Sequence, residues 1–304
     1  MELIKKRGKR ERKEGFWGWL FISPQILGLL VFVAFPLVCS FILCFCDWYD
    51  LSEAPVFNNG QSFVQVFTDP LFWKSFKNTF IYILIVVPLT MIISLSLALL
   101  TNRKLPFKPL YRAAFFLPMV TSTVAIAMVW KFLYRPSMYG GIINTVLVNI
   151  FHCNDIPFLT DPKLGVLSVS LICIWLKIGY YYIIFDAGLK NIPTELYEAA
   201  DIDGAKNWTK IRRITIPMLS NVAFFVIVML FIDVFGMFNE AFILGGAQGG
   251  LDNCMFSLPF YIYYQYAQIG NMGASAVASW VLFLLTGAIT VVQFILKRRT
   301  VYEQ

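Results

Sequence analysis

The sequence predicts an all-helical integral membrane protein with about six transmembrane helices. Of its 304 residues, 58% are hydrophobic and only 14% are charged, and a water-soluble domain of this length could not bury so much apolar surface. A helix needs about 20 apolar residues to cross about 30 Å of hydrocarbon. The period-two alternation of a membrane-spanning β-barrel is absent, so we expect helices. The long apolar runs are residues 16–46, 79–100, 113–134, 164–189, 216–244 and 274–296.

The first run is longer than one straight crossing requires. It contains Pro24 and Pro36, and each proline removes a backbone donor and crowds the preceding turn. We therefore expect a break or kink inside this helix. The run is too long for the apolar part of a cleavable signal peptide, so it should remain as the first span.

The distribution of basic residues along the chain predicts how the spans are oriented in the membrane. Lysines and arginines gather in residues 1–15, in the loop before 113, in the loop at 190–216 and after 297, and the intervening loops hold few. By the positive-inside rule, both termini and the 190–216 loop are cytoplasmic, which agrees with an even number of spans. This distribution accounts for the net charge of +7 without a nucleic-acid partner. The predicted parts are a basic tail (1–15), a first helix (16–46), a helical core (75–297) and a cytoplasmic C-terminus (298–304).

Residues that would carry catalysis are missing from the sequence. His152 is the single histidine, and the six cysteines lack zinc or redox spacing, so we expect no metal site. Cys153 and Cys254 alone could face an oxidising exterior, where a disulfide between them would be compatible with the sequence. Neither a phosphate-binding G-x-x-x-x-G-K-[ST] loop, nor a G-x-S-x-G elbow, nor H-E-x-x-H occurs. We predict a chain without catalytic residues and without a cofactor of its own.

The most informative segment is the polar loop from 191 to 219, NIPTELYEAADIDGAKNWTKIRRITIPML. Pro193 suits a helix start, and Ala199 and Ala200 would allow a partner backbone to approach closely. Glu198 offers a carboxylate that an arginine can bind in a bidentate manner. Gly204 gives the backbone freedom for a turn. The segment therefore predicts a helix, a glycine turn and a second helix lying along one membrane face.

This loop resembles the EAA loop of ATP-binding-cassette (ABC) importer permeases. The match keeps a fixed register over Ile192, Pro193, Leu196, Tyr197, Glu198, Ala199, Ala200, Asp203, Gly204, Ala205, Trp208, Ile214 and Pro217. An ordinary amphipathic loop would need no such register. Further segments are similar to the carbohydrate-importer subgroup: Asn78-Thr79, Leu105-Pro106, Arg112, Phe116-Leu117-Pro118, Trp130, Gly141 to Asn144, Trp175 and Gly188-Leu189. Gly245-Gly246-Ala247 departs from the Gly-Gly-Pro of that subgroup, which puts its stiff turn in doubt.

The resemblance implies the type I importer (MetI-like) permease fold in a bacterial cytoplasmic membrane. It also implies a second homologous permease, two copies of a cytoplasmic ATPase that hold ATP and magnesium, and an extracellular or periplasmic solute-binding protein that delivers carbohydrate. The residues that would couple this chain to the ATPase are Glu198, Ala199, Ala200, Asp203, Gly204 and Ala205.

Polar and aromatic residues within the fourth and fifth runs are candidates for the substrate path. They are Trp175, Lys177, Tyr180 and Tyr181, then Asp233, Asn239 and Glu240. A charge in mid-membrane costs about 3 kcal/mol, so Lys177 and Asp233 should pair, line the cavity, or do both. Tyr180 lies one turn from Lys177 on a face that we expect Tyr181 not to share. Trp130 and Lys131 would face the same cavity or mark the membrane interface.

Three other functions compete with import of a sugar or oligosaccharide. A permease for glycerol phosphate or another polyol would have the same loop. An ion-coupled secondary carrier would need neither this loop nor an ATPase, and such carriers commonly contain internal repeats that are not evident here. A structural or assembly protein of the membrane would not need the glycine turn.

Overall fold

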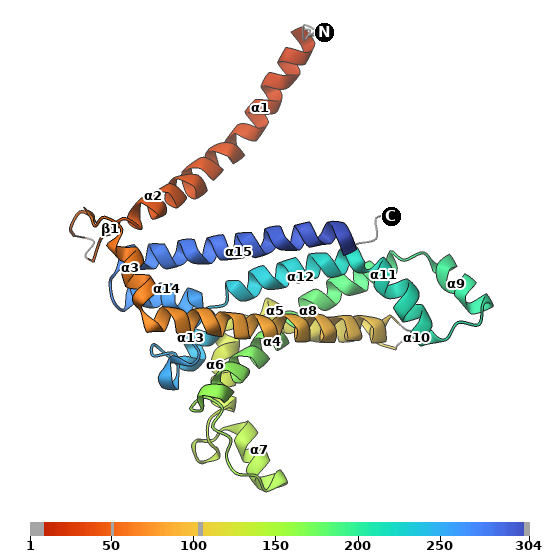
Figure 1. Ribbon diagram of the computed structural model, residues 1–304. Helices are drawn as coiled ribbons and strands as arrows, with labels where there is room; N and C mark the ends of the chain where they lie inside the picture. The colour runs from red at the N-terminus through yellow and green to blue at the C-terminus, as the bar shows by residue number, and fades with distance from the viewer. Residues whose placement is uncertain (1–8, 50–51, 103–105, 301–304) are drawn as a thin grey trace.

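The computed structural model describes residues 9–49, 52–102 and 106–300. Five helical segments in these ranges are long and apolar enough to cross a membrane, and a bent helix pair makes a sixth if it is counted as one span. The prediction of an all-helical protein with about six spans is confirmed. Figure 1 shows the long helices side by side, with the polar loop that follows α8 at one end of the bundle.

The first span leans away from the rest of the bundle (Figure 1). Helix α1 (Lys9–Leu29) continues through a π-helical turn, η1 (Leu30–Ala34), into α2 (Phe35–Leu43). Pro24 lies inside α1 and Pro36 in the first turn of α2, so the interruption between them is a widened turn and not a break. The span contacts the bundle through α2, where the Phe41 ring packs edge-on against Trp280 at 5.2 Å.

A short polar connection joins the first span to the core. Strands β1 (Cys46–Asp47) and β2 (Val56–Phe57) pair in antiparallel fashion, and α3 (Gln61–Thr68) follows. Asp69 then caps α4 (Pro70–Thr101) by accepting a hydrogen bond from the backbone nitrogen of Leu71 at 2.8 Å. The same carboxylate accepts the hydroxyl of Tyr261 from α14 (Leu258–Ala267), so α4 and α14 are tied at one end.

Helix α8 (Pro162–Lys190) lies at the centre of the core and packs along α4. It also packs against α5 (Lys108–Val120), and Gly179 permits this contact. A Cβ atom at position 179 would lie 1.8 Å from the carbonyl oxygen of Phe115, which is far inside van der Waals contact. Glycine at this position therefore sets how close the two helices come.

The third apolar run, 113–134, is bent, which the sequence analysis did not predict. It is divided into α5 and α6 (Thr123–Leu133), which meet at an angle of 95°. Pro118 lies near the end of α5, and Ser122 caps α6 through the backbone nitrogen of Ala125. A proline followed by a serine cap ends one helix and begins another.

The fifth run is also divided. Helix α11 (Ile216–Met218) leads into α12 (Ser220–Phe235), and α13 (Asn239–Gly245) follows an irregular step at residues 236–238. Asn239 and Glu240 thus belong to a short helix beyond the bend. The remaining elements are η2 (Ser137–Tyr139), α7 (Ile142–Phe151), α9 (Thr194–Ile202), α10 (Asn207–Lys210), η3 (Ile211–Thr215), η4 (Leu251–Asn253) and α15 (Met272–Thr300).

The two cysteines considered for a disulfide are both free thiols. Cys153 is exposed, whereas Cys254 is buried, and burial raises the pKa of the Cys254 thiol. A buried thiol with a raised pKa forms less of the reactive thiolate. The structure therefore does not support a bridge between them.

Asp186 forms a cluster of ion pairs that the sequence analysis missed. Its side chain is 5% exposed, near the end of α8, and it pairs with Arg112 and with Lys108 at 3.7 Å, both from α5. Lys190, one turn further along α8, pairs with it at 2.9 Å. One buried carboxylate therefore holds α5 against α8 and keeps three cations together.

We predict that Asp186→Asn destabilises the bundle. Removal of one member of a buried ion pair costs about 3–5 kcal/mol, and the partial exposure of the three cations reduces the expected loss to about 2–3 kcal/mol. The melting temperature of the detergent-solubilised protein measures this loss. Asp252→Asn is the matched control, because the Asp252 side chain is 74% exposed. Its ion pair with Lys74 should therefore contribute only about 0–1 kcal/mol to stability. Equal melting temperatures for the two variants would contradict a structural role for Asp186.

Candidate functional site

The first candidate site lies in the middle of the bundle, where α8 meets α12. The Lys177 amine lies 3.2 Å from the Asp233 carboxylate, and the hydroxyl of Tyr181 donates a hydrogen bond to the same carboxylate oxygen at 2.7 Å. Lys177 is close to the midpoint of α8, so this pair lies in the hydrocarbon region. Pairing between Lys177 and Asp233, one of the two roles expected from the sequence, is present.

The Asp233 side chain remains open on one side. It is 36% exposed and that of Lys177 is 20% exposed, although Tyr181 is fully buried. A half-open carboxylate is costly against lipid tails, so this surface must meet water, substrate or another protein. Pairing between the two charges therefore does not exclude their lining a cavity.

The prediction that Tyr180 shares a helical face with Lys177 and that Tyr181 does not is wrong. Residues three and four positions apart share a helical face, so Tyr181 also lies above Lys177, and it is Tyr181 that contacts Asp233. Tyr180 is half-buried and packs edge-on against the Tyr181 ring at 5.1 Å. Tyr180 thus supports the cluster without a polar contact to its charges.

Aromatic residues continue along the same helix toward the end away from the polar loop. Trp175 is 41% exposed, and its ring meets Trp130 of α6 edge-on at 5.8 Å. The amine of Lys131 donates to the carbonyl oxygen of Ile243 in α13 at 2.7 Å. Lys131 therefore ties α6 to α13, whereas Trp130 and Trp175 form a partly open aromatic surface.

Asn239 and Glu240, the last two candidates for the substrate path, differ in their exposure. Asn239 is exposed at the start of α13. Glu240 is only 8% exposed and lies beside the buried Cys173 thiol of α8. Asn239 is accessible from outside this chain, whereas Glu240 sits in the packing between α13 and α8.

The second candidate site is the polar loop, which has the predicted helix, glycine turn and second helical stretch. Helix α9 ends at Ile202, Gly204 has φ of +69°, and α10 begins at Asn207. A positive φ is disfavoured for residues with a Cβ, so glycine suits this turn. No atom lies within 4 Å of where a Cβ of residue 204 would be. The requirement for glycine there is thus conformational and not a matter of space.

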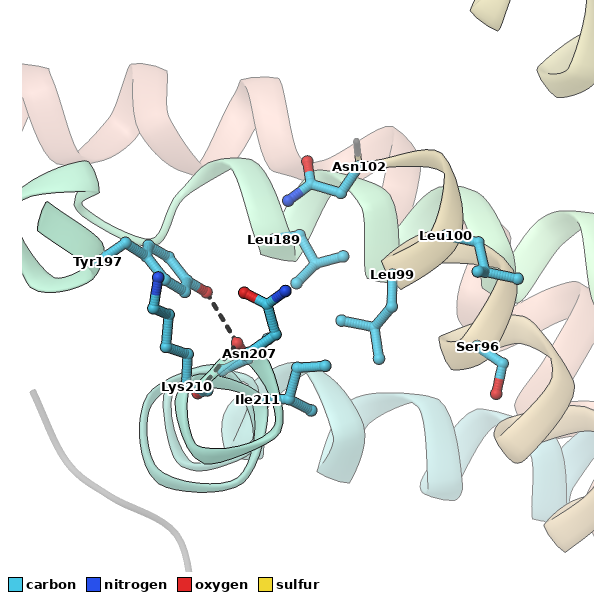
Figure 2. Close-up of a pocket in the computed structure, with 10 residues that line it drawn as sticks. Ser96, Leu99, Leu100, Asn102, Leu189, Tyr197, Asn207, Lys210 and Ile211 are labelled. Carbon is cyan, nitrogen blue, oxygen red and sulfur yellow. Dashed lines mark hydrogen bonds between the residues drawn. The ribbon is translucent and has the colours of Figure 1, made fainter. Parts of the chain in front are cut away.

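Two polar contacts hold α9 against the second stretch. The hydroxyl groups of Tyr197 and Thr215 lie 2.9 Å apart, and Lys210 forms an ion pair with Asp201. Figure 2 shows the Tyr197 side chain reaching from α9 toward the helical turns that carry Lys210 and Ile211. These contacts fix α9 relative to the helix that re-enters the membrane.

A groove of about 650 Å³ opens between this loop and the ends of α4 and α8 (Figure 2). Leucines and an isoleucine form much of its wall, and polar groups face it from the loop. Its lining residues are Ser96, Leu99, Leu100, Asn102, Leu189, Tyr197, Asn207, Lys210, Ile211 and Thr215. On this side the loop therefore borders open space.

The outer surface of the loop is exposed. Of the predicted coupling residues, Glu198, Ala199, Asp203 and Gly204 are exposed, and Ala200 and Ala205 are half-buried. Two apolar side chains that the sequence analysis did not include among the coupling residues also project from it: Ile202 is 88% exposed and Trp208 is 71% exposed. Large apolar side chains on an otherwise polar loop could have identified this surface, because they typically mark protein contacts.

A bundle of membrane-crossing helices with a charged pair at its middle and a helix–turn–helix loop at one face defines a membrane transport subunit. Comparison with known proteins gives the particular group. The chain belongs to the family described as the binding-protein-dependent transport system inner membrane component, which matches residues 90–302. It is accordingly a multi-pass protein of the inner membrane.

Two curated relatives and one solved structure illustrate the similarity. A probable ABC transporter permease protein of Bacillus subtilis, YesP, is 33% identical over 95% of this chain and 93% of its own length. The lactose transport system permease protein LacF of Rhizobium radiobacter is 32% identical over 91% and 92%. A chain of the bacterial alginate ABC transporter, solved with an alginate pentasaccharide-bound periplasmic protein, is 22% identical over 95% and 96%, with a TM-score of 0.80. That last likeness confirms the permease fold.

We predict that Lys177→Met or Asp233→Leu alone reduces the yield of assembled complex, because each leaves one charge unpaired in the membrane at a cost of about 3 kcal/mol. The double variant should restore assembly, measured by size-exclusion chromatography, while substrate transport stays well below wild type. Tyr180→Phe is the control for assembly, because Tyr180 makes no contact with either charge. Wild-type transport by the double variant would remove the pair from the substrate path, and poor assembly of that variant would argue against simple pairing.

Proposed function

We propose that this chain is the transmembrane permease subunit of an ATP-driven ABC importer for a sugar or oligosaccharide. Its full-length similarity to permease proteins, one of them named for lactose, supports the class of transporter and the carbohydrate substrate. The observation that carries the proposal is the helix–glycine–helix loop with exposed Ile202 and Trp208, since a chain without a nucleotide site must receive work from another subunit.

A second homologous permease would complete the substrate path. The open side of Asp233 lies at mid-membrane, where contact with lipid tails is unfavourable. A partner packed against this face of α8 and α12 would enclose the Lys177–Asp233 pair in an aqueous cavity between the two chains. Both charges could then bind hydroxyl groups of a sugar while each still compensates the other.

Aromatic surfaces suit the same substrate class. Sugar rings stack on exposed aromatic faces, and Trp175, beside Trp130, offers one that is 41% exposed. Asn239 adds an amide that can donate to and accept from hydroxyl groups. A solute-binding protein would deliver the sugar to this end of the bundle, away from the polar loop.

Coupling would take place at the outer surface of the loop. Ile202 and Trp208 are suited to anchor in an apolar cleft of a cytoplasmic ATPase, and Glu198 to pair with a basic residue at its edge. ATP and magnesium would be bound by two copies of that ATPase, which hydrolyse the nucleotide. Closure of the ATPases would move α9, and the contacts Tyr197–Thr215 and Asp201–Lys210 would transmit this movement to α12.

We predict that Gly204→Val uncouples the transporter. Forcing a β-branched residue to φ of +69° costs about 1–2 kcal/mol, so the turn should open and α9 should lose its position. Co-purification of the ATPase and sugar-stimulated ATP hydrolysis, with the solute-binding protein present, measure the effect. Gly204→Asn is the matched control, because asparagine tolerates this conformation and open space surrounds the site.

The outcome also tests the proposed function. Undiminished ATPase retention and coupled hydrolysis in Gly204→Val would contradict the docking role of this loop. Hydrolysis that responds to a polyol phosphate but to no sugar would instead favour the alternative substrate class.

We predict a cytoplasmic loop and an exterior Cys153 from the distribution of basic residues. Cys153 is exposed between α7 and α8, and an Ile202→Cys variant presents a thiol on the loop. In intact cells an impermeant maleimide should label Cys153 and should reach position 202 only after permeabilisation. The reverse pattern would invert the topology. Residues 1–8 and 301–304 of the two termini, which we also expect to be cytoplasmic, lie outside the described residues, so positions 153 and 202 serve as the reporters.

A further inference from the structure

A second cavity, of about 350 Å³, lies between α4 and α8 at the end of the bundle opposite the polar loop. Neither the substrate path nor the coupling surface uses it. Lysines stand at one end of its lining and aliphatic side chains at the other. The lining residues are Lys74, Lys77, Asn78, Ile81, Ile85, Pro162, Lys163, Val166, Leu167, Asp252 and Cys254.

The lysines lie at the level of the lipid headgroups. At 1.5 Å per residue, α4 rises about 36 Å from Lys77 to Thr101, and α8 rises about 40 Å from Lys163 to Lys190. A bilayer measures about 30 Å across its hydrocarbon and about 40–45 Å with its headgroups. Trp73, half exposed one turn before Lys77, is of the type that lies at this boundary.

The aliphatic part of the cavity runs into the hydrocarbon region. Ile81 and Ile85 lie one and two turns beyond Lys77 on the same face of α4, which places Ile85 about 12 Å deeper than Lys77. Leu167 lies one turn beyond Lys163 on α8 and is 49% exposed. A water-soluble protein could reach the lysines but not this depth, whereas an acyl chain extends there naturally.

Charge complementarity favours an anion at the mouth. Lys74 is paired with Asp252 at 2.7 Å, but Lys77 and Lys163 form no ion pair with any residue that the structure describes. Asp161 is close by, and its carboxylate is engaged by the backbone nitrogens of Lys163 and Leu164 at the start of α8. Three lysines against Asp252 and Asp161 leave one net positive charge, beside the positive end of the α8 dipole.

We propose that this cavity is a binding site for an anionic phospholipid. The phosphate would lie between Lys77 and Lys163, and the first part of one acyl chain would follow Ile81, Ile85 and Leu167. Such a lipid would fill the space between α4 and α8, the two helices at the centre of the core. The site rests on the membrane location of the chain and not on its proposed substrate.

The test is titration of the purified transporter complex with phosphatidylglycerol, followed by native mass spectrometry. Each lysine near an anionic headgroup contributes about a fivefold change in affinity, so K77Q and K163Q should each weaken binding by about that factor and the double variant by about 25-fold. K74Q is the matched control, because it removes the same charge from the same surface but from a lysine that Asp252 already neutralises. Size-exclusion chromatography serves as the control that each variant remains folded.

A second measurement locates the lipid. The complex is placed in phosphatidylcholine vesicles that contain a phosphatidylglycerol with a photoreactive group early in its acyl chain. This lipid should cross-link to residues of α4 and α8 around Ile85 and Leu167. Equal affinity of wild type and the double variant, equal losses for K74Q and K77Q, or cross-links confined to other helices would overturn the proposal. A defect of the double variant only in docking of the solute-binding protein, with lipid binding intact, would assign the lysines to a protein contact instead.

Discussion

The structure depends on how one apolar bundle accommodates the charges of α8. This helix carries Lys177 near its middle and Asp186 near the polar loop, and neither side chain can remain unpaired in lipid. Asp233 of α12 compensates the first charge, and Arg112 and Lys108 of α5 compensate the second. Because these partners come from α12 and from α5, the ion pairs hold both helices against α8.

The two charge clusters differ in exposure, and the difference agrees with the roles that we propose for them. The Asp186 side chain is 5% exposed and surrounded by three cations, so it serves the packing of α5 on α8. The Asp233 side chain is 36% exposed and has a single cation and a tyrosine hydroxyl. A charged group that the fold leaves partly open at mid-membrane is available to a ligand, whereas a buried one surrounded by three cations is not.

The polar loop is positioned by contacts outside the two charge clusters of α8. Its position is set by two contacts, Tyr197 with Thr215 and Asp201 with Lys210, while its outer surface leaves Ile202 and Trp208 exposed. The groove beneath it separates the loop from the ends of α4 and α8. Two fixed contacts on one side and open space on the other are the features that the proposed coupling role would require of this loop.

The helical membrane class, the approximate spans and the glycine turn at 204 could be predicted from the amino-acid sequence alone. These depend on local properties: the length of an apolar run, the placement of basic residues and the lack of a Cβ. The sequence also limited Lys177 and Asp233 to two roles, because an isolated charge in hydrocarbon is costly in any fold. The packing of the helices was needed to learn that Tyr181 and not Tyr180 joins the pair, that Asp186 is a centre of ion pairing, and that Glu240 is buried whereas Asn239 is open. Each of these outcomes depends on which helix lies opposite a given face, and no local pattern in one helix specifies the face that its neighbour presents.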